Sequence, residues 1–267
     1  MAALAFAALD PPATFQQPRL MFPIRDHNPS GRVPYVTYTL MFLNIAIFLS
    51  YFTLLNDPAT EYDFYNTWAL VPVRLTNGDH FSALITSMFL HGGWMHLAGN
   101  MLFLWIFGDN IEDEMGHVLY LAFYLACGVA AGLSQVVTAP LSNVPMVGAS
   151  GAIAGVMGGY LLLYPKAKVD ILLFLIIFVR IFPVPAWVML MLWFAMQFFG
   201  GISSDPDAGG VAYWAHAGGF VAGLILTIPF WLKAGASTFW ERTEGHPPHP
   251  EATYPAIESR LPKVKRK

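Results

Sequence analysis

Long apolar stretches, separated by short polar segments, dominate the pattern of residues along this chain. A helix that crosses a lipid bilayer needs about 20 predominantly apolar residues. The pattern predicts six such helices, at residues 36–55, 91–108, 118–139, 144–164, 185–200 and 211–232. The chain is therefore predicted to be an all-α polytopic membrane protein built as a bundle of six transmembrane helices.

Residues 169–199 form the one ambiguous apolar stretch, because Asp170 and Arg180 interrupt it and two prolines follow. We interpret residues 169–183 as an interfacial hairpin or amphipathic segment that precedes the fifth helix. The alternative is a seventh span at residues 171–182, but its 12 residues are too few to cross a bilayer.

The distribution of Lys and Arg orients the predicted bundle, since these residues accumulate on the cytoplasmic side of membranes. With six spans, 13 of the 14 basic residues fall on one side and only Arg74 on the other. We therefore expect a cytoplasmic segment at 1–33, a membrane domain at 34–234 and a disordered cytoplasmic tail at 235–267. The outward-facing loops are those at about 56–90 and about 200–210.

Composition supports a membrane protein and excludes several functions. Hydrophobic residues make up 56% of the chain and charged residues 12%, against about 25% charged in an average soluble domain; the mean hydropathy is +0.51. A formal net charge of −3 offers no basic surface for nucleic acid. The single cysteine, Cys127, excludes a disulfide framework. No basic residue precedes the apolar residues 1–9, so no signal peptide is expected.

Unusual polar residues lie near the outer ends of the second, fourth and sixth predicted helices, which run in the same direction. The second carries His96 and Asn100, which are four residues apart and share one helix face. Ser150 lies near the start of the fourth helix and His216 near the start of the sixth. These side chains are thus predicted at a similar depth.

Small residues indicate which of these helices touch. Two stripes with a four-residue step run along the fourth and sixth helices: Gly151, Gly155 and Gly159, and Ala215, Gly219 and Gly223. Such stripes let transmembrane backbones approach closely. Ser150 and His216 each lie beside one stripe. If the stripes face each other, the two side chains come within hydrogen-bond reach, which is the nucleophile–base geometry of covalent catalysis.

Each of these residues taken alone is also compatible with a structural role or another function. An isolated serine or histidine in a membrane helix more often bonds a backbone carbonyl, and His96 with Asn100 is also compatible with an interhelical clasp. No Asp or Glu lies mid-span, which leaves a channel or transporter without an obvious proton or cation relay. A zinc site of His91, His96 and His216 lacks an H-E-x-x-H motif. No metal and no cofactor are therefore predicted.

Three motifs, in this order and spacing, resemble the rhomboid family of intramembrane serine proteases. Gly148-Ala149-Ser150-Gly151 is similar to its G-x-S-G, His96-Leu-Ala-Gly-Asn100 to its H-x-x-x-N, and 215–223 to its A-H-x-x-G-x-x-x-G. The resemblance covers residues 21–233 and implies a rhomboid-like six-helix bundle. The segment from Met21 resembles the start of many prokaryotic members. This similarity implies that the protein lies in a prokaryotic inner membrane. It also implies that residues 1–20 are either an extension or the result of a mis-assigned start.

The resemblance implies a role for each matching residue. Ser150 is the nucleophile and His216 the general base of a Ser–His dyad without an acidic third member. His96 and Asn100, with the backbone N–H of Ser150, form the oxyanion hole. Four glycines support the site by close backbone approach: Gly148, Gly151, Gly219 and Gly223.

Some positions depart from the family pattern or match it outside the dyad. Some members place an aromatic residue four positions after the nucleophile, against the catalytic histidine, but here that position is Ala154. The sequence therefore does not assign the group that orients His216, and Trp214 lies on another helix face. His91 is expected to be structural, as are the residues of the Gly108, Glu112 and Gly116 pattern.

The implied substrates are other membrane proteins, cut in or near a transmembrane segment close to the outer face. The implied partners are these substrates and the lipid bilayer, not nucleic acid. The loop at about 200–210 is expected to cap the site, and the loop at about 56–90 to lie half-embedded at the membrane interface. The alternative is a catalytically inactive rhomboid-like chaperone or adaptor.

Overall fold

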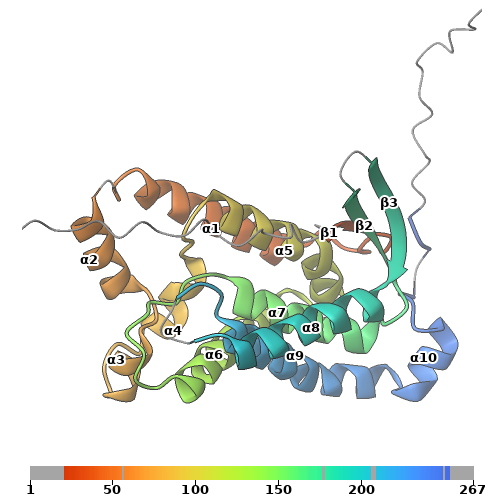
Figure 1. Ribbon diagram of the computed structural model, residues 1–267. Coiled ribbons are helices and arrows are strands. Elements are labelled where there is room, and N and C mark those ends of the chain that lie inside the picture. The colour runs from red at the N-terminus through yellow and green to blue at the C-terminus, as the bar shows by residue number, and fades with distance from the viewer. Residues whose placement is uncertain (1–20, 56, 176–177, 206–208, 249, 253–267) are drawn as a thin grey trace, which may run out of the picture.

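The computed structural model describes residues 21–55, 57–175, 178–205, 209–248 and 250–252. Six long helices lie side by side in these parts of the chain (Figure 1): α1 (Tyr35–Phe52), α5 (Trp94–Met115), α6 (His117–Thr138), α7 (Ser150–Leu163), α8 (Ala186–Ser203) and α9 (Tyr213–Ala234). By length and composition, α1, α6, α8 and α9 are able to cross a membrane. The helical bundle predicted from the sequence is confirmed.

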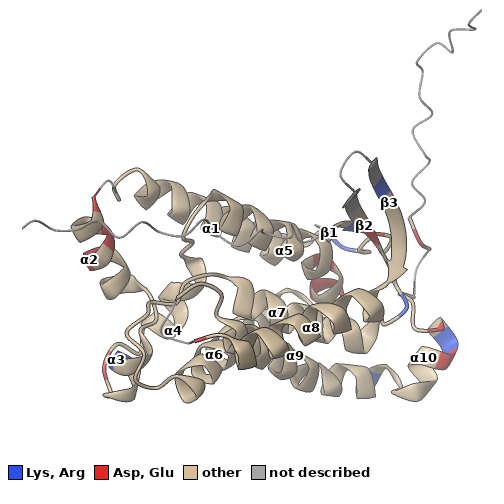
Figure 2. Ribbon diagram, in the orientation of Figure 1, with Lys and Arg blue, Asp and Glu red and all other residues tan. Residues whose placement is uncertain are grey.

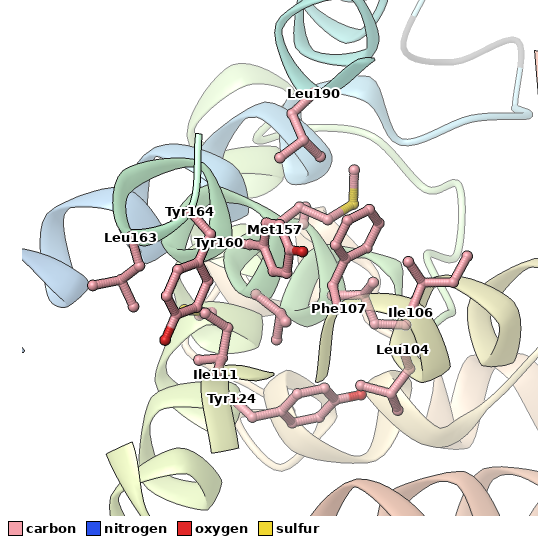
Figure 3. Close-up of a cluster of buried hydrophobic side chains, with 14 of the residues drawn as sticks. Leu104, Ile106, Phe107, Ile111, Tyr124, Met157, Tyr160, Leu163, Tyr164 and Leu190 are labelled. Atoms are coloured by element: carbon pink, nitrogen blue, oxygen red, sulfur yellow. The ribbon is translucent and has the colours of Figure 1, made fainter. Parts of the chain in front are cut away.

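Helix α7 forms the centre of the bundle and is buried along almost its whole length. Figure 3 shows its side chains Met157 and Tyr160 among those of α5, α6 and α8, including Phe107, Tyr124 and Leu190. These five side chains are each no more than 1% exposed. Because protein rather than lipid surrounds α7, this helix can be as short as 14 residues.

Helix α7 begins six residues later than the predicted span at 144–164. Residues before it are held in extended conformation, since Met146 and Leu70 exchange two backbone hydrogen bonds of 2.8 and 3.0 Å. The Gly148 N–H also donates to the Ser87 carbonyl at 2.9 Å. As a result Ser150 is the first residue of α7.

The two stripes of small residues face each other across α7 and α9, as predicted. A Cβ atom on Gly219 would collide with the Gly151 carbonyl oxygen, and one on Gly223 with the backbone of Gly155. A Cβ on Gly158 would likewise meet the Phe220 carbonyl. We call this contact the glycine seam. It holds the starts of α7 and α9 at the same level.

One end of the bundle, here called the loop end, carries the segment predicted as the loop at about 56–90. This segment folds into short helices: α2 (Pro58–Trp68), α3 (Pro72–Thr76), α4 (Ala83–Thr86) and η1 (Ser87–Phe89). Asp57 caps α2 by accepting hydrogen bonds from the N–H groups of Ala59 and Thr60. The side chains of Trp68 and Phe81 are exposed, whereas Met88 is buried.

The opposite end, here called the sheet end, carries a three-stranded antiparallel sheet of β1 (Met21–Asp26), β2 (Lys168–Leu175) and β3 (Phe178–Pro185), in that order. The hairpin interpretation of residues 169–183 is confirmed by β2 and β3. An all-α description misses this sheet, and β1 ties part of the predicted N-terminal segment to the hairpin. Figure 2 shows that charged residues gather at the two ends of the bundle.

The prediction of a disordered tail from residue 235 is wrong for its first part. Residues Ser237–Thr243 form helix α10, and Phe239 is only 2% exposed. The Trp240 indole N–H donates to the Leu162 carbonyl at 3.0 Å. Apolar burial and this bond hold α10 against the end of α7. Residues 1–20 and 253–267 lie outside the described residues.

Glu112 near the end of α5 has the structural role expected of it. Its carboxylate is 1% exposed and accepts hydrogen bonds from the N–H groups of Val36 and Thr37, at 2.8 and 2.7 Å. It also accepts from the Thr37 hydroxyl at 2.7 Å and contacts His117 Nδ1 at 2.6 Å. Glu112 therefore satisfies the first N–H groups of α1, which no bond inside that helix reaches.

Candidate active site

A serine and a histidine meet where the glycine seam reaches the loop end. Ser150 Oγ and His216 Nε2 are 2.7 Å apart. Ser150 is the first residue of α7 and His216 the fourth of α9. The seam brings the two backbones together, so the hydrogen bond follows from the small residues that the sequence places beside each partner.

The other ring nitrogen of His216 has a partner that the sequence analysis missed. Gln197 Oε1 on α8 lies 2.8 Å from His216 Nδ1. One turn earlier on α8, the Trp193 ring lies 5.8 Å from the imidazole, tilted by 33°. Gln197 is the single amide in the apolar run 186–199, which also has no charged residue. That isolated polar side chain in a membrane helix is the signal that could have found it.

Trp214 does not orient His216, in agreement with the sequence analysis. Its ring packs against Gly201, where a Cβ would lie 2.8 Å from it, and against the Phe198 ring at 5.9 Å. Ala154 lies in the core and is 0% exposed. The residues that contact the His216 imidazole on the side away from Ser150 are Gln197 and Trp193 of α8, and not Trp214 or Ala154.

The predicted oxyanion residues border the same cavity as the Ser150–His216 pair. This cavity has a volume of about 510 Å³ and is lined by His96, Asn100, Gly148, Ser150 and His216, among others. His96 Nδ1 accepts a hydrogen bond from the Gly92 N–H at 3.4 Å. In a neutral imidazole the other nitrogen, Nε2, then carries the proton. Nε2 lies against Gly148, where a Cβ atom would be 2.7 Å away.

Asn100, Gly148 and Gly151 also line this cavity, whereas Gly219 and Gly223 lie farther along α9 in the glycine seam. The Asn100 side chain is in the cavity wall, and its Nδ2 donates to the His96 carbonyl at 3.1 Å. Gly148 has φ +128°, which other residues rarely adopt, and leaves no room for a side chain beside His96. Gly151, Gly219 and Gly223 belong to the glycine seam. The structure therefore brings His96, Asn100, Gly148, Ser150, Gly151 and His216 together around one cavity.

Both loops at the loop end contribute to the cavity wall. Ser204, Asp205, Gly209 and Gly210, from the loop predicted as a cap, line it, while 206–208 lie outside the described residues. Ser87 and Met88 line it from the other loop. The cavity thus opens at the loop end of the bundle and not at the sheet end.

His91 lies behind His96 rather than in the cavity wall. It is fully buried, its backbone N–H donates to the Tyr51 hydroxyl at 2.6 Å, and its ring is 5.1 Å from that of His96. Among the described residues, no three His, Cys, Asp or Glu side chains gather as metal ligands do. The arrangement offers instead a hydroxyl, a base and N–H donors around one cavity.

Comparison of the sequence with known proteins identifies the family. A family model described as the Rhomboid domain matches residues 78–233. The chain belongs to the rhomboid family. It is an integral multi-pass membrane protein, and membership of this family is compatible with intramembrane proteolysis or with another rhomboid-like function.

Several curated rhomboid proteins are similar to this chain. Rhomboid protein 1, mitochondrial, of Saccharomyces cerevisiae is 34% identical over 149 residues, which cover 54% of this chain and 40% of the yeast protein. Rhomboid protease GluP of Bacillus subtilis is 31% identical over 125 residues, or 47% and 24% of the two chains. Rhomboid-like protein 11, chloroplastic, of Arabidopsis thaliana is 42% identical over 71 residues, or 27% and 25%. This rhomboid matches less than half the length of each relative.

Proposed function

We propose that this protein is an intramembrane serine endopeptidase, which cuts transmembrane segments of other membrane proteins with a Ser150–His216 pair. The observation that carries the proposal is the 2.7 Å contact between Ser150 Oγ and His216 Nε2 at the wall of a 510 Å³ cavity. Membership of the rhomboid family supports it, as does the similarity to a relative named a rhomboid protease.

The first half of the reaction forms an acyl-enzyme. His216 Nε2 takes the hydroxyl proton of Ser150 while Oγ bonds to the carbonyl carbon of the scissile peptide. The carbonyl electron pair moves onto oxygen, giving a tetrahedral oxyanion. When this intermediate collapses, the C–N bond breaks and the leaving amine takes the proton from His216 Nε2. In the second half, water oxygen bonds to the acyl carbon while His216 Nε2 takes a water proton. The ester bond between the acyl carbon and Ser150 Oγ then breaks, and Oγ takes that proton from His216.

In the proposed mechanism, three N–H donors are assigned to the oxyanion of the tetrahedral intermediate. Two of them are His96 Nε2–H and Asn100 Nδ2–H, whose residues line the cavity from α5. The backbone N–H of Ser150 belongs to the first turn of α7, where N–H groups have no partner within the helix. Removing one such donor typically costs about 10²–10³ in rate, because the donors are already oriented in a low-dielectric site.

The substrate must reach the cavity from the membrane and expose a peptide bond. Met95 and Phe103 of α5 and Trp193 of α8 all line the cavity, which supports entry between these two helices. A helical peptide bond is shielded by its own hydrogen bonds. The substrate therefore unwinds locally, and helix-breaking residues near the cut favour this step.

The membrane orientation follows from the positive-inside rule. Arg74 is the single basic residue of the described loop end, so this end and the cavity face outward and the sheet end faces the cytoplasm. The resemblance of the segment from Met21 to prokaryotic members supports a prokaryotic inner membrane, while two of the similar proteins carry mitochondrial and chloroplastic names.

Cleavage by the purified protein tests the proposal. In detergent micelles with a fluorescent model transmembrane substrate, the wild type is expected to cut, and Ser150→Ala and His216→Ala are expected to lose activity. Ser50→Ala, on the surface of α1, is the matched control and is expected to cut like the wild type. Equal turnover by wild type and Ser150→Ala rejects the proposal and leaves the non-catalytic chaperone or adaptor function.

A further inference from the structure

We propose that Gln197 is a positioning residue that holds His216 in the reactive tautomer, and that it does so only while α8 is docked against α9. The inference rests on the proposed protease function and adds α8 to the catalytic unit. It makes the unit a serine, a histidine and an amide contributed by three different helices.

The orientation of the Gln197 amide decides which nitrogen of His216 carries the proton. Gln197 Nε2 donates to the Trp193 carbonyl at 3.3 Å, and its Oε1 lies 2.8 Å from His216 Nδ1. An amide oxygen only accepts, so Nδ1 must be the protonated nitrogen. His216 Nε2 is then left with a lone pair, 2.7 Å from Ser150 Oγ.

The opposite amide orientation is unfavourable and would be unproductive. It would place the amide oxygen against the Trp193 carbonyl oxygen, with no hydrogen between them. It would also donate a proton toward Nδ1 and so move the imidazole proton to Nε2. In that tautomer His216 cannot accept the proton of Ser150. The backbone carbonyl of Trp193 therefore fixes the orientation of the Gln197 amide, and the amide oxygen fixes the tautomer of His216.

A neutral amide suits this position inside the membrane. Gln197 is 7% exposed. A carboxylate buried to that extent carries a large desolvation penalty, whereas a hydrogen-bonded amide does not. Gln197 uses both ends of its amide, so it orients the imidazole without placing a charge among apolar side chains.

Helix α8 is held to the bundle by a narrow stripe that contains Gln197. Four of its 18 residues are buried: Ala186, Leu190, Gln197 and Gly201. One turn beyond Gln197, a Cβ on Gly200 would lie 2.6 Å from the Tyr213 ring, and one on Gly201 2.8 Å from the Trp214 ring. These contacts fix the outer end of α8 against the start of α9. A displacement of α8 there separates Gln197 from His216.

The first test compares Gln197→Met with Gln197→Glu. Methionine matches glutamine in length but removes the acceptor. A buried glutamic acid stays protonated because of the same desolvation penalty, so its O–H donates to the Trp193 carbonyl and its carbonyl oxygen accepts from His216 Nδ1. We expect Gln197→Met to lower kcat about 10- to 100-fold, with KM changed less than about threefold, and Gln197→Glu to restore most of the loss. Met196→Ala, on the lipid-facing side of α8, is the control and keeps wild-type kcat.

Two outcomes overturn the inference. The first is a wild-type kcat in Gln197→Met. The second is a kcat in Gln197→Glu as low as in Gln197→Met, when both variants keep the wild-type melting temperature. Either leaves the proposed function intact as long as the wild type cuts and Ser150→Ala does not. If the wild type itself does not cut, the proposed function fails instead.

A second test addresses the docking of α8. Gly201→Leu places a bulky side chain against Trp214 and moves α8 without contacting His216. If docking acts through Gln197, adding Gln197→Met to Gly201→Leu causes little further loss of kcat. Losses that multiply in the double variant contradict the coupling of α8 docking to His216.

Discussion

His216 makes two hydrogen bonds with opposite roles, and this division is the central feature at the scale of single residues. Its Nδ1 lies against Gln197 and its Nε2 against Ser150. Ser150, His216, His96 and Asn100 were predictable because each is an unusual polar residue inside an apolar span. The partnership with Gln197 was not, since it depends on how α8 and α9 pack, which residue spacing within one helix does not determine.

Asn100 provides a test of transition-state binding. One Nδ2 hydrogen of Asn100 bonds the His96 carbonyl, and the second is the one proposed to donate to the oxyanion. A hydrogen bond made only in the transition state contributes to turnover and little to substrate affinity. We expect Asn100→Ala to lower kcat about 10²- to 10³-fold while KM stays nearly constant. Steady-state kinetics in micelles measure both parameters, with the exposed Asn77→Ala as control. A rise in KM without a fall in kcat would show that Asn100 binds substrate and not the transition state.

Asp26 at the sheet end makes stability depend on pH. Burial raises the pKa of Asp26 to about 8, and the Asp109 carboxylate adds to the rise, opposed by a hydrogen bond from the Tyr160 hydroxyl. The folded protein therefore keeps a proton that the unfolded chain releases near pH 4, and stability falls as pH rises from about 4 to about 8.

The Asp26→Asn variant removes this titration. Its melting temperature is expected to fall less between pH 5 and pH 8 than that of the wild type, measured in the same detergent. Asp63→Asn, on the exposed surface of α2, is expected to show the same change of melting temperature with pH as the wild type. Parallel curves for Asp26→Asn and wild type would mean that Asp26 is ionised in the folded protein at neutral pH.

At the scale of elements, the glycine seam between α7 and α9 determines the site. Its stripes were visible in the sequence because a four-residue step is a local property of a helix. The β-sheet was not, because β1 pairs with β2 across roughly 145 residues of chain, and the apolar run of β2 and β3 has no clear period. The sequence also did not predict that α7 begins only at Ser150, because the preceding Met146 pairs with Leu70 from another loop.

The seam predicts a strong difference between two Gly→Ala changes. In Gly219→Ala the new methyl group meets the Gly151 carbonyl oxygen, whereas a Cβ on Gly99 has no neighbour within 4 Å. We expect Gly219→Ala to lower the free energy of unfolding by about 1–3 kcal/mol, as overpacking does, and to reduce cleavage. Gly99→Ala is expected to match or exceed wild-type stability. Equal melting temperatures for both variants would contradict the close approach of α7 and α9.

At the scale of the whole molecule, the cavity lies at one end of the bundle and the sheet with α10 at the other. Single-cysteine labelling tests which end faces outward, because the native thiol of Cys127 is 0% exposed. Thr76→Cys at the loop end is expected to react with a membrane-impermeant maleimide on intact cells. Ser237→Cys at the sheet end is expected to react only after lysis. The reverse pattern would place the cavity on the cytoplasmic side.

Covalent labelling of Ser150 tests directly whether His216 activates its hydroxyl. A fluorophosphonate reacts with a serine hydroxyl only when a nearby base activates it, and peptide mass spectrometry locates the adduct. The folded wild type is expected to carry the adduct on Ser150, and folded His216→Ala is expected to carry none. An unmodified Ser150 in the wild type, or labelling of Ser150 at the same rate without His216, would show that the two residues do not form a catalytic pair.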